Sequence, residues 1–294
     1  MGALAVQVGI DSYSYHRRYG EARAGEAPSA HEPWPLEPSP VLRHAREVSA
    51  DVVFLETCYL PAPEAITAEM LAPATDHGIR VGLSWGHPWH SGAFHGLDGG
   101  RSPGAEAVLA RWIEAAARLG HDVMRITAGS PASRGDEPAQ VLVERLVGPV
   151  RRAADLAASL GVRLALENHG DLRVADILSL FELVARPATM GVCLDNVNLI
   201  RVGDDMAEGT RALAPHTLLV QLKDHIAGAP DMPGGPVSTA LGEGVADLDQ
   251  LIGILAAAGF DGPVCVELAS LGPDDVDELA MIERSLVWLR DRLG

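Results

Sequence analysis

The stretch Leu160-Gly161-Val162-Arg163-Leu164-Ala165-Leu166-Glu167 (residues 160–167) decides the fold of this chain. A helix-favouring run ends on Gly161, a short apolar strand candidate follows, and Glu167 stands at its end. Glycine is the common C-cap residue of a helix because it accepts the left-handed backbone conformation found there. The same step from helix through glycine to strand recurs at Gly78, Gly120 and Gly259. The repeated step indicates a chain of alternating strands and helices.

Eight short β-branched or apolar runs are strand candidates. They are residues 6–10, 52–55, 80–83, 123–126, 163–166, 190–194, 218–222 and 263–266. The stretches between them have helical character, among them residues 105–119, 139–160 and 276–293. Eight repeats of a strand followed by a helix predict an α/β fold.

A closed (β/α)8 TIM barrel and an open, doubly wound sheet both fit this alternation. No GxGxxG turn follows the first strand, as a dinucleotide-binding open sheet would have. Acidic, amide and histidine side chains stand instead at the ends of successive strands, which form the active face of a barrel. We therefore predict one TIM-barrel domain over residues 1–294. Long connections at 13–40, 86–103 and 226–244 predict a deep pocket partly covered by βα loops.

Composition limits the classes of function. The 294 residues include 23 Lys and Arg against 40 Asp and Glu, a net charge of −17, which would repel nucleic acid. No run approaches the roughly 20 apolar residues of a membrane span, and the first residues do not resemble a signal peptide. We expect a cytoplasmic protein that binds neither nucleic acid nor membranes. Cys58, Cys193 and Cys265 are expected to be buried thiols.

Four oxygen-bearing side chains stand at strand ends in the second half of the chain: Glu167, Asp195, Gln221 and Glu267. Their spacing fits one βα unit each, so neighbouring strands could bring them around one ion. Three carboxylates and an amide oxygen suit Mg²⁺ or Mn²⁺, and close carboxylates repel one another without a cation. Alternatively, each acid forms a local hydrogen bond or salt bridge. The amide oxygen of Gln221 is the weakest of the four ligands, and Gln221 could instead orient a neighbouring side chain.

Five motifs in the second half of the chain add a family resemblance. They are Leu166-Glu167-Asn168-His169-Gly170, Cys193-Leu194-Asp195-Asn196-Val197-Asn198, Gln221-Leu222-Lys223-Asp224, Leu241-Gly242-Glu243-Gly244 and Val266-Glu267. In this order they resemble motifs of the xylose-isomerase-like TIM-barrel superfamily of sugar isomerases and epimerases. The resemblance implies that Glu167, Asp195, Gln221 and Glu267 bind a divalent metal. The third position is more often histidine, and glutamine there is similar to what some dehydratase branches use.

The first strand and its loop suggest a branch of that superfamily. The stretch Gly9-Ile10-Asp11-Ser12-Tyr13-Ser14-Tyr15-His16-Arg17-Arg18-Tyr19-Gly20-Glu21 resembles the α subunits of bacterial C-glycoside deglycosidases. This resemblance implies a lyase that cleaves 3-oxo-glycosides, C-glycosides among them, by β-elimination and releases the aglycone. It also implies a small β subunit, and barrels of the superfamily often form homo-oligomers. The alternative is an isomerase or epimerase acting on a keto-sugar or a sugar phosphate.

Both activities begin with the removal of a proton next to a sugar carbonyl. His169 lies two residues beyond Glu167, on the same face of an extended chain, and is the predicted general base. We expect Glu167 and Glu267 to move protons as well, and Lys223 to hold an oxyanion or a substrate hydroxyl. The structural alternatives are a loop-capping role for His169 and a surface ion pair for Lys223.

Six further residues near the strand ends are predicted to contact the substrate. They are His16, Glu56, Trp85, His87, Arg125 and Asn198. An indole can stack on a sugar ring, and polar side chains can bind its hydroxyl groups. The alternatives are a buried ion pair for Arg125 and a turn role for Asn198. A sugar-binding protein without catalysis would not need the metal ion.

Overall fold

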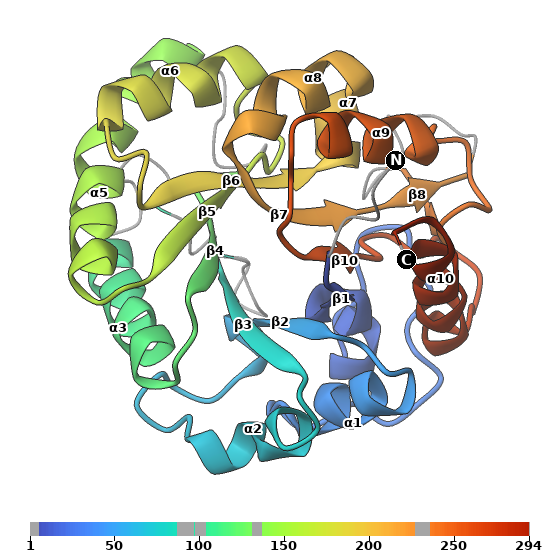
Figure 1. Cartoon of the computed structure of the whole chain (residues 1–294). Helices are drawn as coiled ribbons and strands as arrows, with labels where there is room; N and C mark the ends of the chain where they lie inside the picture. The colour runs from blue at the N-terminus through green and yellow to red at the C-terminus, as the bar shows by residue number, and fades with distance from the viewer. Residues whose placement is uncertain (1–5, 87–96, 98–103, 131–136, 227–235, 294) are drawn as a thin grey trace.

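The computed structural model describes residues 6–86, 97, 104–130, 137–226 and 236–293. Eight parallel strands close into a barrel in the order β1-β10-β7-β6-β5-β4-β3-β2, and helices surround it (Figure 1). The barrel strands are β1 (Val8–Asp11), β2 (Val52–Glu56), β3 (Arg80–Trp85), β4 (Val123–Thr127), β5 (Arg163–Glu167), β6 (Met190–Asp195), β7 (Thr217–Leu222) and β10 (Val264–Val266). All eight strand candidates are found, and the predicted TIM barrel is confirmed.

The helices follow the strands around the ring. They are α1 (Ser39–Glu47), α2 (Ala68–Thr75), α3 (Ala105–Arg118), α5 (Ala139–Ser159), α6 (Val174–Val184), α7 (Asn196–Arg201), α8 (Met206–Leu213), α9 (Leu248–Ala257) and α10 (Glu278–Leu293). Three short 3-10 helices, η1 (Ser12–Tyr19), η2 (Thr57–Tyr59) and η4 (Ala214–His216), and the antiparallel pair β8 (Asp224–His225) and β9 (Ser238–Thr239) complete the described elements. No described helix is long and apolar enough to cross a membrane.

The period of two along each strand separates the barrel interior from the helix-facing core. A small cluster fills the interior, with members such as Ala165, Cys193 and Cys265. A much larger cluster joins the outer faces of the strands to the helices. Because side chains alternate, the interior residues of β5, β6 and β10 are followed two positions later by Glu167, Asp195 and Glu267. The strand pattern therefore directs these three acids into the barrel mouth.

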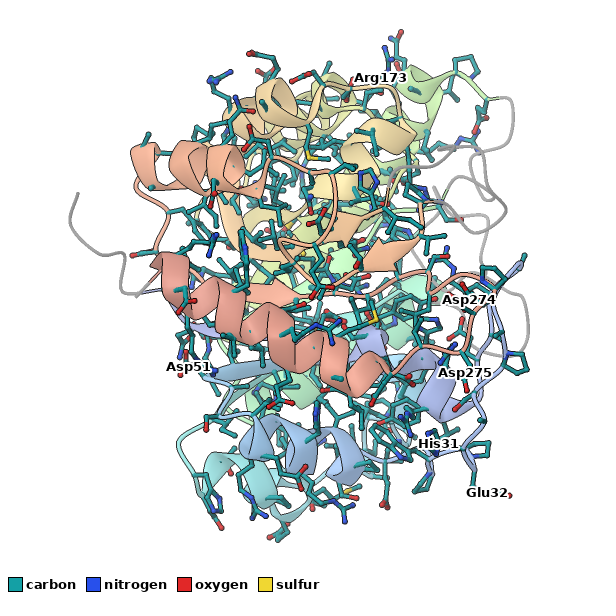
Figure 2. All side chains as sticks on the ribbon, turned by 90° about the vertical axis from the view of Figure 1, so that its right-hand side faces the viewer. His31, Glu32, Asp51, Arg173, Asp274 and Asp275 are labelled. Atoms are coloured by element: carbon teal, nitrogen blue, oxygen red, sulfur yellow. The ribbon has the colours of Figure 1, made fainter. Side chains whose placement is uncertain are left out.

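The long connection after β1 is partly helical. Its first part forms η1, in which every residue is buried. Arg17 and Arg18 of η1 bind Glu278 of α10 at 3.2 Å and 2.8 Å, which ties the segment to the last helix. Most of the connection at 86–103, and residues 227–235 of the connection at 226–244, lie outside the described residues. Figure 2 shows Asp51, just before β2, at one end of the molecule, and Arg173 and Asp274, beyond the ends of β5 and β10, toward the other.

The three cysteines are free, as predicted. Cys193 and Cys265 are buried inside the barrel, and Cys58 is partly buried. Burial raises the pKa of each thiol well above its ordinary value. They are therefore packing residues rather than ready nucleophiles.

We predict that Gly82→Ala destabilises the barrel. Gly82 of β3 lies opposite Phe54 of β2, and a Cβ at Gly82 would stand 2.5 Å from the Phe54 ring. Overpacking of this kind lowers the free energy of unfolding by about 1–3 kcal/mol, measurable by urea denaturation. The matched control is Gly253→Ala in α9, where a Cβ meets nothing within 4 Å. That change should stabilise the helix by about 0.5–1 kcal/mol. Wild-type stability in Gly82→Ala would contradict the packing.

Candidate active site

Three acidic side chains converge at the mouth of the barrel. Glu167 ends β5, Asp195 ends β6, and Glu267 follows β10 directly. All three side chains are buried. Shared polar neighbours connect them, so the structure brings together the three carboxylates expected from the strand ends.

Lys223 lies between two of these carboxylates. Its Nζ is 2.5 Å from Asp195 Oδ2 and 2.8 Å from Glu267 Oε1. The side chain of Lys223 is buried. The alternative interpretation of Lys223, a surface ion pair, is therefore wrong. Burial acts to lower the pKa of Lys223, but Asp195 and Glu267 outweigh it and raise the pKa above its ordinary value. The group is therefore a permanent ammonium in this arrangement.

Arg125 of β4 bridges the opposite side of the site. Its guanidinium is ion-paired with Glu56 at the end of β2, and its Nε lies 3.2 Å from Glu167 Oε2. A third contact is the hydrogen bond from Nη1 to the Trp85 carbonyl at 3.4 Å. Arg125 and Glu56 thus form a buried ion pair that abuts Glu167, as the structural alternative for Arg125 proposed.

Negative charge exceeds positive charge in this interior. Among the residues described, the buried carboxylates of Asp11, Glu56, Glu167, Asp195 and Glu267 are accompanied by two buried cations, Arg125 and Lys223. Burial raises the pKa of Glu167 to about 8 despite Arg125, and the pKa of Glu267 to about 7 despite Lys223. Glu167 Oε2 and Glu267 Oε2 are buried and accept no hydrogen bond from the described residues, although Arg125 Nε lies 3.2 Å from Glu167 Oε2 as an ion-pair contact. The site therefore has room for a further positive charge.

Asn198 connects Glu167 with Asp195. Its Nδ2 donates to Asp195 Oδ2 at 2.6 Å and to Glu167 Oε1 at 3.2 Å, and its Oδ1 accepts from Arg201 at 3.0 Å. Asp195 is also the N-cap of α7, with Oδ1 accepting from the backbone N–H groups of Val197 and Asn198. The start of α7 therefore holds both carboxylates in place.

Two asparagines that the sequence analysis did not select as site residues fix the strand ends. Asn168 donates to the carbonyl of Asp195 at 2.7 Å and accepts from its N–H at 2.8 Å. Asn196 makes the same pair of bonds with the backbone of Lys223, at 2.9 Å and 2.8 Å. Each asparagine directly follows a site carboxylate, so the repeated acid-Asn pair was the available sequence signal. Each one positions the site residue of the next strand.

Asp224 is a second structural residue that the sequence analysis passed over. Its carboxylate accepts hydrogen bonds from the backbone N–H groups of Gly242, Gly244 and Ala246 at 2.9–3.1 Å. A Cβ at Gly244 would collide with this carboxylate, so the close approach requires glycine. The motif at 241–244 is therefore anchored beside Lys223.

His169 lies at the edge of the carboxylate site. Its Nδ1 is 2.8 Å from the carbonyl oxygen of Gly129, and its Nε2 is 4.0 Å from Glu167 Oε1. A carbonyl only accepts, so Nδ1 carries the proton and the lone pair of the neutral ring is on Nε2. The side chain is partly exposed, at 19%. This tautomer presents a basic nitrogen on the side of the ring that faces the carboxylates.

Gln221 belongs to a separate polar group inside the barrel. Its amide nitrogen donates to Asp11 Oδ2 at 2.9 Å, and its oxygen accepts from the Cys193 thiol at 3.1 Å. Ser84 donates to the same Asp11 oxygen at 3.2 Å. Among the described residues, no three His, Cys, Asp or Glu side chains stand in an arrangement ready to hold a metal ion. The metal-binding role of Glu167, Asp195, Gln221 and Glu267 stays a prediction.

Two of the predicted substrate contacts, His16 and Trp85, are not brought to the carboxylates. The ring of His16 is buried, with Nδ1 2.9 Å from the Tyr13 carbonyl and Nε2 3.0 Å from Glu26. Trp85 is part of the hydrophobic core between the barrel and the helices, because it alternates with the inward-facing Ser84. His87 lies outside the described residues.

We predict that Asn168→Asp lowers stability. The change replaces the amide donor that faces the Asp195 carbonyl with an oxygen, and adds a carboxylate to an acid-rich interior. The free energy of unfolding should fall by about 1–3 kcal/mol, as for an unpaired buried polar group. The matched control is Gln140→Glu, an exposed amide of α5, for which we expect a change within about 0.5 kcal/mol. Equal losses in the two variants at neutral pH would show that the Asn168 bridge contributes nothing.

Comparison with solved structures supports the barrel. An L-ribulose 3-epimerase matches with a TM-score of 0.70 and 18% identity, covering 98% of this chain and 94% of the other. A 3-keto-D-glucoside 4-epimerase from E. coli matches with a TM-score of 0.68 and 17% identity. The match covers 97% of this chain and 99% of the epimerase. A xylose isomerase-like TIM barrel protein from Mycobacterium smegmatis, in complex with magnesium, matches with a TM-score of 0.70 and 17% identity. The match covers 100% of this chain and 98% of the other. At these identities, the similarity shows the fold.

The family follows from the sequence itself. No curated protein matches the chain. The family described as xylose isomerase-like TIM barrel matches residues 42–292, which is most of the chain. This match includes all five motifs of the second half of the barrel. The chain therefore belongs to the xylose isomerase-like TIM barrel family.

Proposed function

We propose that this chain is a divalent-metal-dependent enzyme that removes a proton next to the carbonyl of a keto-sugar and acts as an isomerase or epimerase. The observation that carries the proposal is the pairing of a buried carboxylate cluster with a histidine base. Nε2 of His169 lies 4.0 Å from Oε1 of Glu167, and Asn198 links Glu167 to Asp195. The L-ribulose and 3-keto-D-glucoside epimerases on the same fold support the choice of substrate class.

The donor set fits a hard divalent cation. Glu167 and Glu267 each keep a buried oxygen without a hydrogen-bond partner among the described residues, and buried carboxylates outnumber buried cations. Glu167, Asp195 and Glu267 would hold the ion, with Gln221 as the predicted fourth ligand once its amide leaves Asp11. Bound Mn²⁺ or Mg²⁺ polarises the sugar carbonyl and stabilises the negative charge of the enolate.

The protein side chains supply the proton transfers. Neutral His169 accepts the proton from the carbon next to the carbonyl at Nε2, while the Gly129 carbonyl holds Nδ1–H and stabilises the imidazolium. The Lys223 ammonium donates to the oxygen on which charge develops. His169 can give the abstracted proton back to the face from which it came, whereas Glu167 or Glu267, on different strands, can deliver to another face a proton that it has first taken from solvent. Return to the opposite face gives an epimer, and return to the former carbonyl carbon gives an isomer.

A lyase acting on 3-oxo-glycosides is the second candidate. It shares the first proton abstraction, after which the enolate expels the group at the β position. Its sequence support is the stretch at 9–21 together with Gln221 at the third ligand position. Much of that stretch forms the buried helix η1, where Arg17 and Arg18 bind Glu278. These contacts are structural, and the matches to epimerases do not support the C-glycoside branch. The narrower resemblance, the small β subunit and a homo-oligomer stay predictions.

One assay tests the two candidates together. The purified chain is incubated in D₂O with Mn²⁺ or with EDTA, and given either L-ribulose and D-fructose or a 3-oxo-C-glycoside. We expect interconversion of free keto-sugars with deuterium at the reacting carbon, lost with EDTA. Release of the aglycone without sugar interconversion would establish the lyase in place of the isomerase or epimerase. Turnover that EDTA does not reduce would contradict the metal requirement.

We predict that His169→Gln lowers kcat by about 10²–10⁴-fold, the usual contribution of a general base. Glutamine can still donate to the Gly129 carbonyl but cannot accept the proton at neutral pH. The measurement is the rate of deuterium exchange into the keto-sugar, with Mn²⁺ affinity as a parallel readout that should stay near the wild-type value. The matched control is His77→Gln, an exposed histidine between α2 and β3. Full exchange in His169→Gln would assign the base to another residue.

A further inference from the structure

Lys223 is the only lysine in the chain. The other 22 basic residues are arginines, including the buried Arg17, Arg18 and Arg125, which all form ion pairs. An ammonium differs from a guanidinium in being a compact point charge without a planar fork. It is therefore the basic side chain closest in shape to a metal ion. The carboxylate site is the one place where the chain uses it.

The ammonium stands where two of the predicted metal ligands meet. Nζ is within 2.8 Å of oxygens of both Asp195 and Glu267, and the backbone of Lys223 is held at both its N–H and its carbonyl by Asn196. With these oxygens occupied, the described residues offer no arrangement of three ligands for a metal.

We propose that the Lys223 ammonium is the built-in counter-ion of this site and that a divalent cation competes with it for Asp195 and Glu267. The inference rests on the metal-binding part of the proposed function. A divalent ion and an ammonium a few ångströms apart repel strongly in a buried site, so the metal displaces the ammonium rather than binding beside it. The chain can therefore fold without metal, and metal binding frees Lys223 to reach a substrate oxygen.

Isothermal titration with Mn²⁺ tests the competition. Lys223→Met keeps the length of the side chain and removes its charge, so we expect the dissociation constant for Mn²⁺ to fall at least tenfold below wild type. Lys223→Arg keeps a positive charge and should show no such gain. The matched control is Arg18→Met, which removes a buried cation paired with Glu278 outside the site. This control should lower the melting temperature but leave Mn²⁺ affinity unchanged. Circular dichroism confirms that each variant folds.

The single lysine also provides a test in the wild-type chain. Protein labelled with ¹³C-lysine gives one Cε–Hε signal from residue 223. We expect added Mg²⁺ to shift this signal in a saturable way, with the dissociation constant that a parallel calorimetric titration with Mg²⁺ gives. A signal that does not move while Mg²⁺ binds would overturn the proposal.

The outcomes separate this inference from the proposed function. If both proteins bind Mn²⁺ and Lys223→Met binds equally or more weakly, competition is overturned and the metal site of the proposed function stands. If neither wild type nor Lys223→Met binds Mn²⁺, the metal requirement of the proposed function fails together with the inference. Tighter Mn²⁺ binding by Lys223→Met than by wild type supports both the competition and the metal site of the proposed function.

Discussion

The excess of buried carboxylate charge at the mouth of the barrel is the constraint on which the rest of the site depends. Within the part of the chain that the structure describes, five buried acids share this interior with two buried cations, Arg125 and Lys223. Burial of a charged group without a counter-charge is costly, and the raised pKa values of Glu167 and Glu267 reflect that cost. Arg125, Lys223 and Asn198 each direct positive or hydrogen-bonding nitrogen atoms at these carboxylates. The same excess makes the site suitable for a cation.

Hydrogen bonds from neighbouring strands hold these charged side chains in fixed positions. Asn168 and Asn196 continue the hydrogen bonding beyond the strand ends, and each aligns the site residue of the next strand. Asp195 caps α7 while its other oxygen faces Lys223. Carboxylates held in this way keep their separation even though they repel one another. Such preorganisation is what stabilisation of a developing enolate requires.

The proposed proton abstraction uses groups that differ in their exposure. The side chain of His169 is partly exposed, whereas Lys223 and the carboxylates are almost fully buried. A base near the opening can exchange its proton with solvent between turnovers. The buried charges, in contrast, act in surroundings of low polarity, where electrostatic effects are strongest. This division fits an enzyme that returns protons to a sugar without losing substrate atoms.

The sequence alone determined the alternation of strands and helices, the closed barrel, and the acids at the ends of β5, β6 and β10, because period and capping are local properties. The tertiary structure decided which side chains pair with each other through hydrogen bonds and ion pairs. Gln221 binds Asp11, 210 residues away in the chain, and His16 turns to Glu26. Lys223 reaches two carboxylates from different strands. Such pairings depend on which side chains compete for one buried charge, and that competition arises only when the barrel closes.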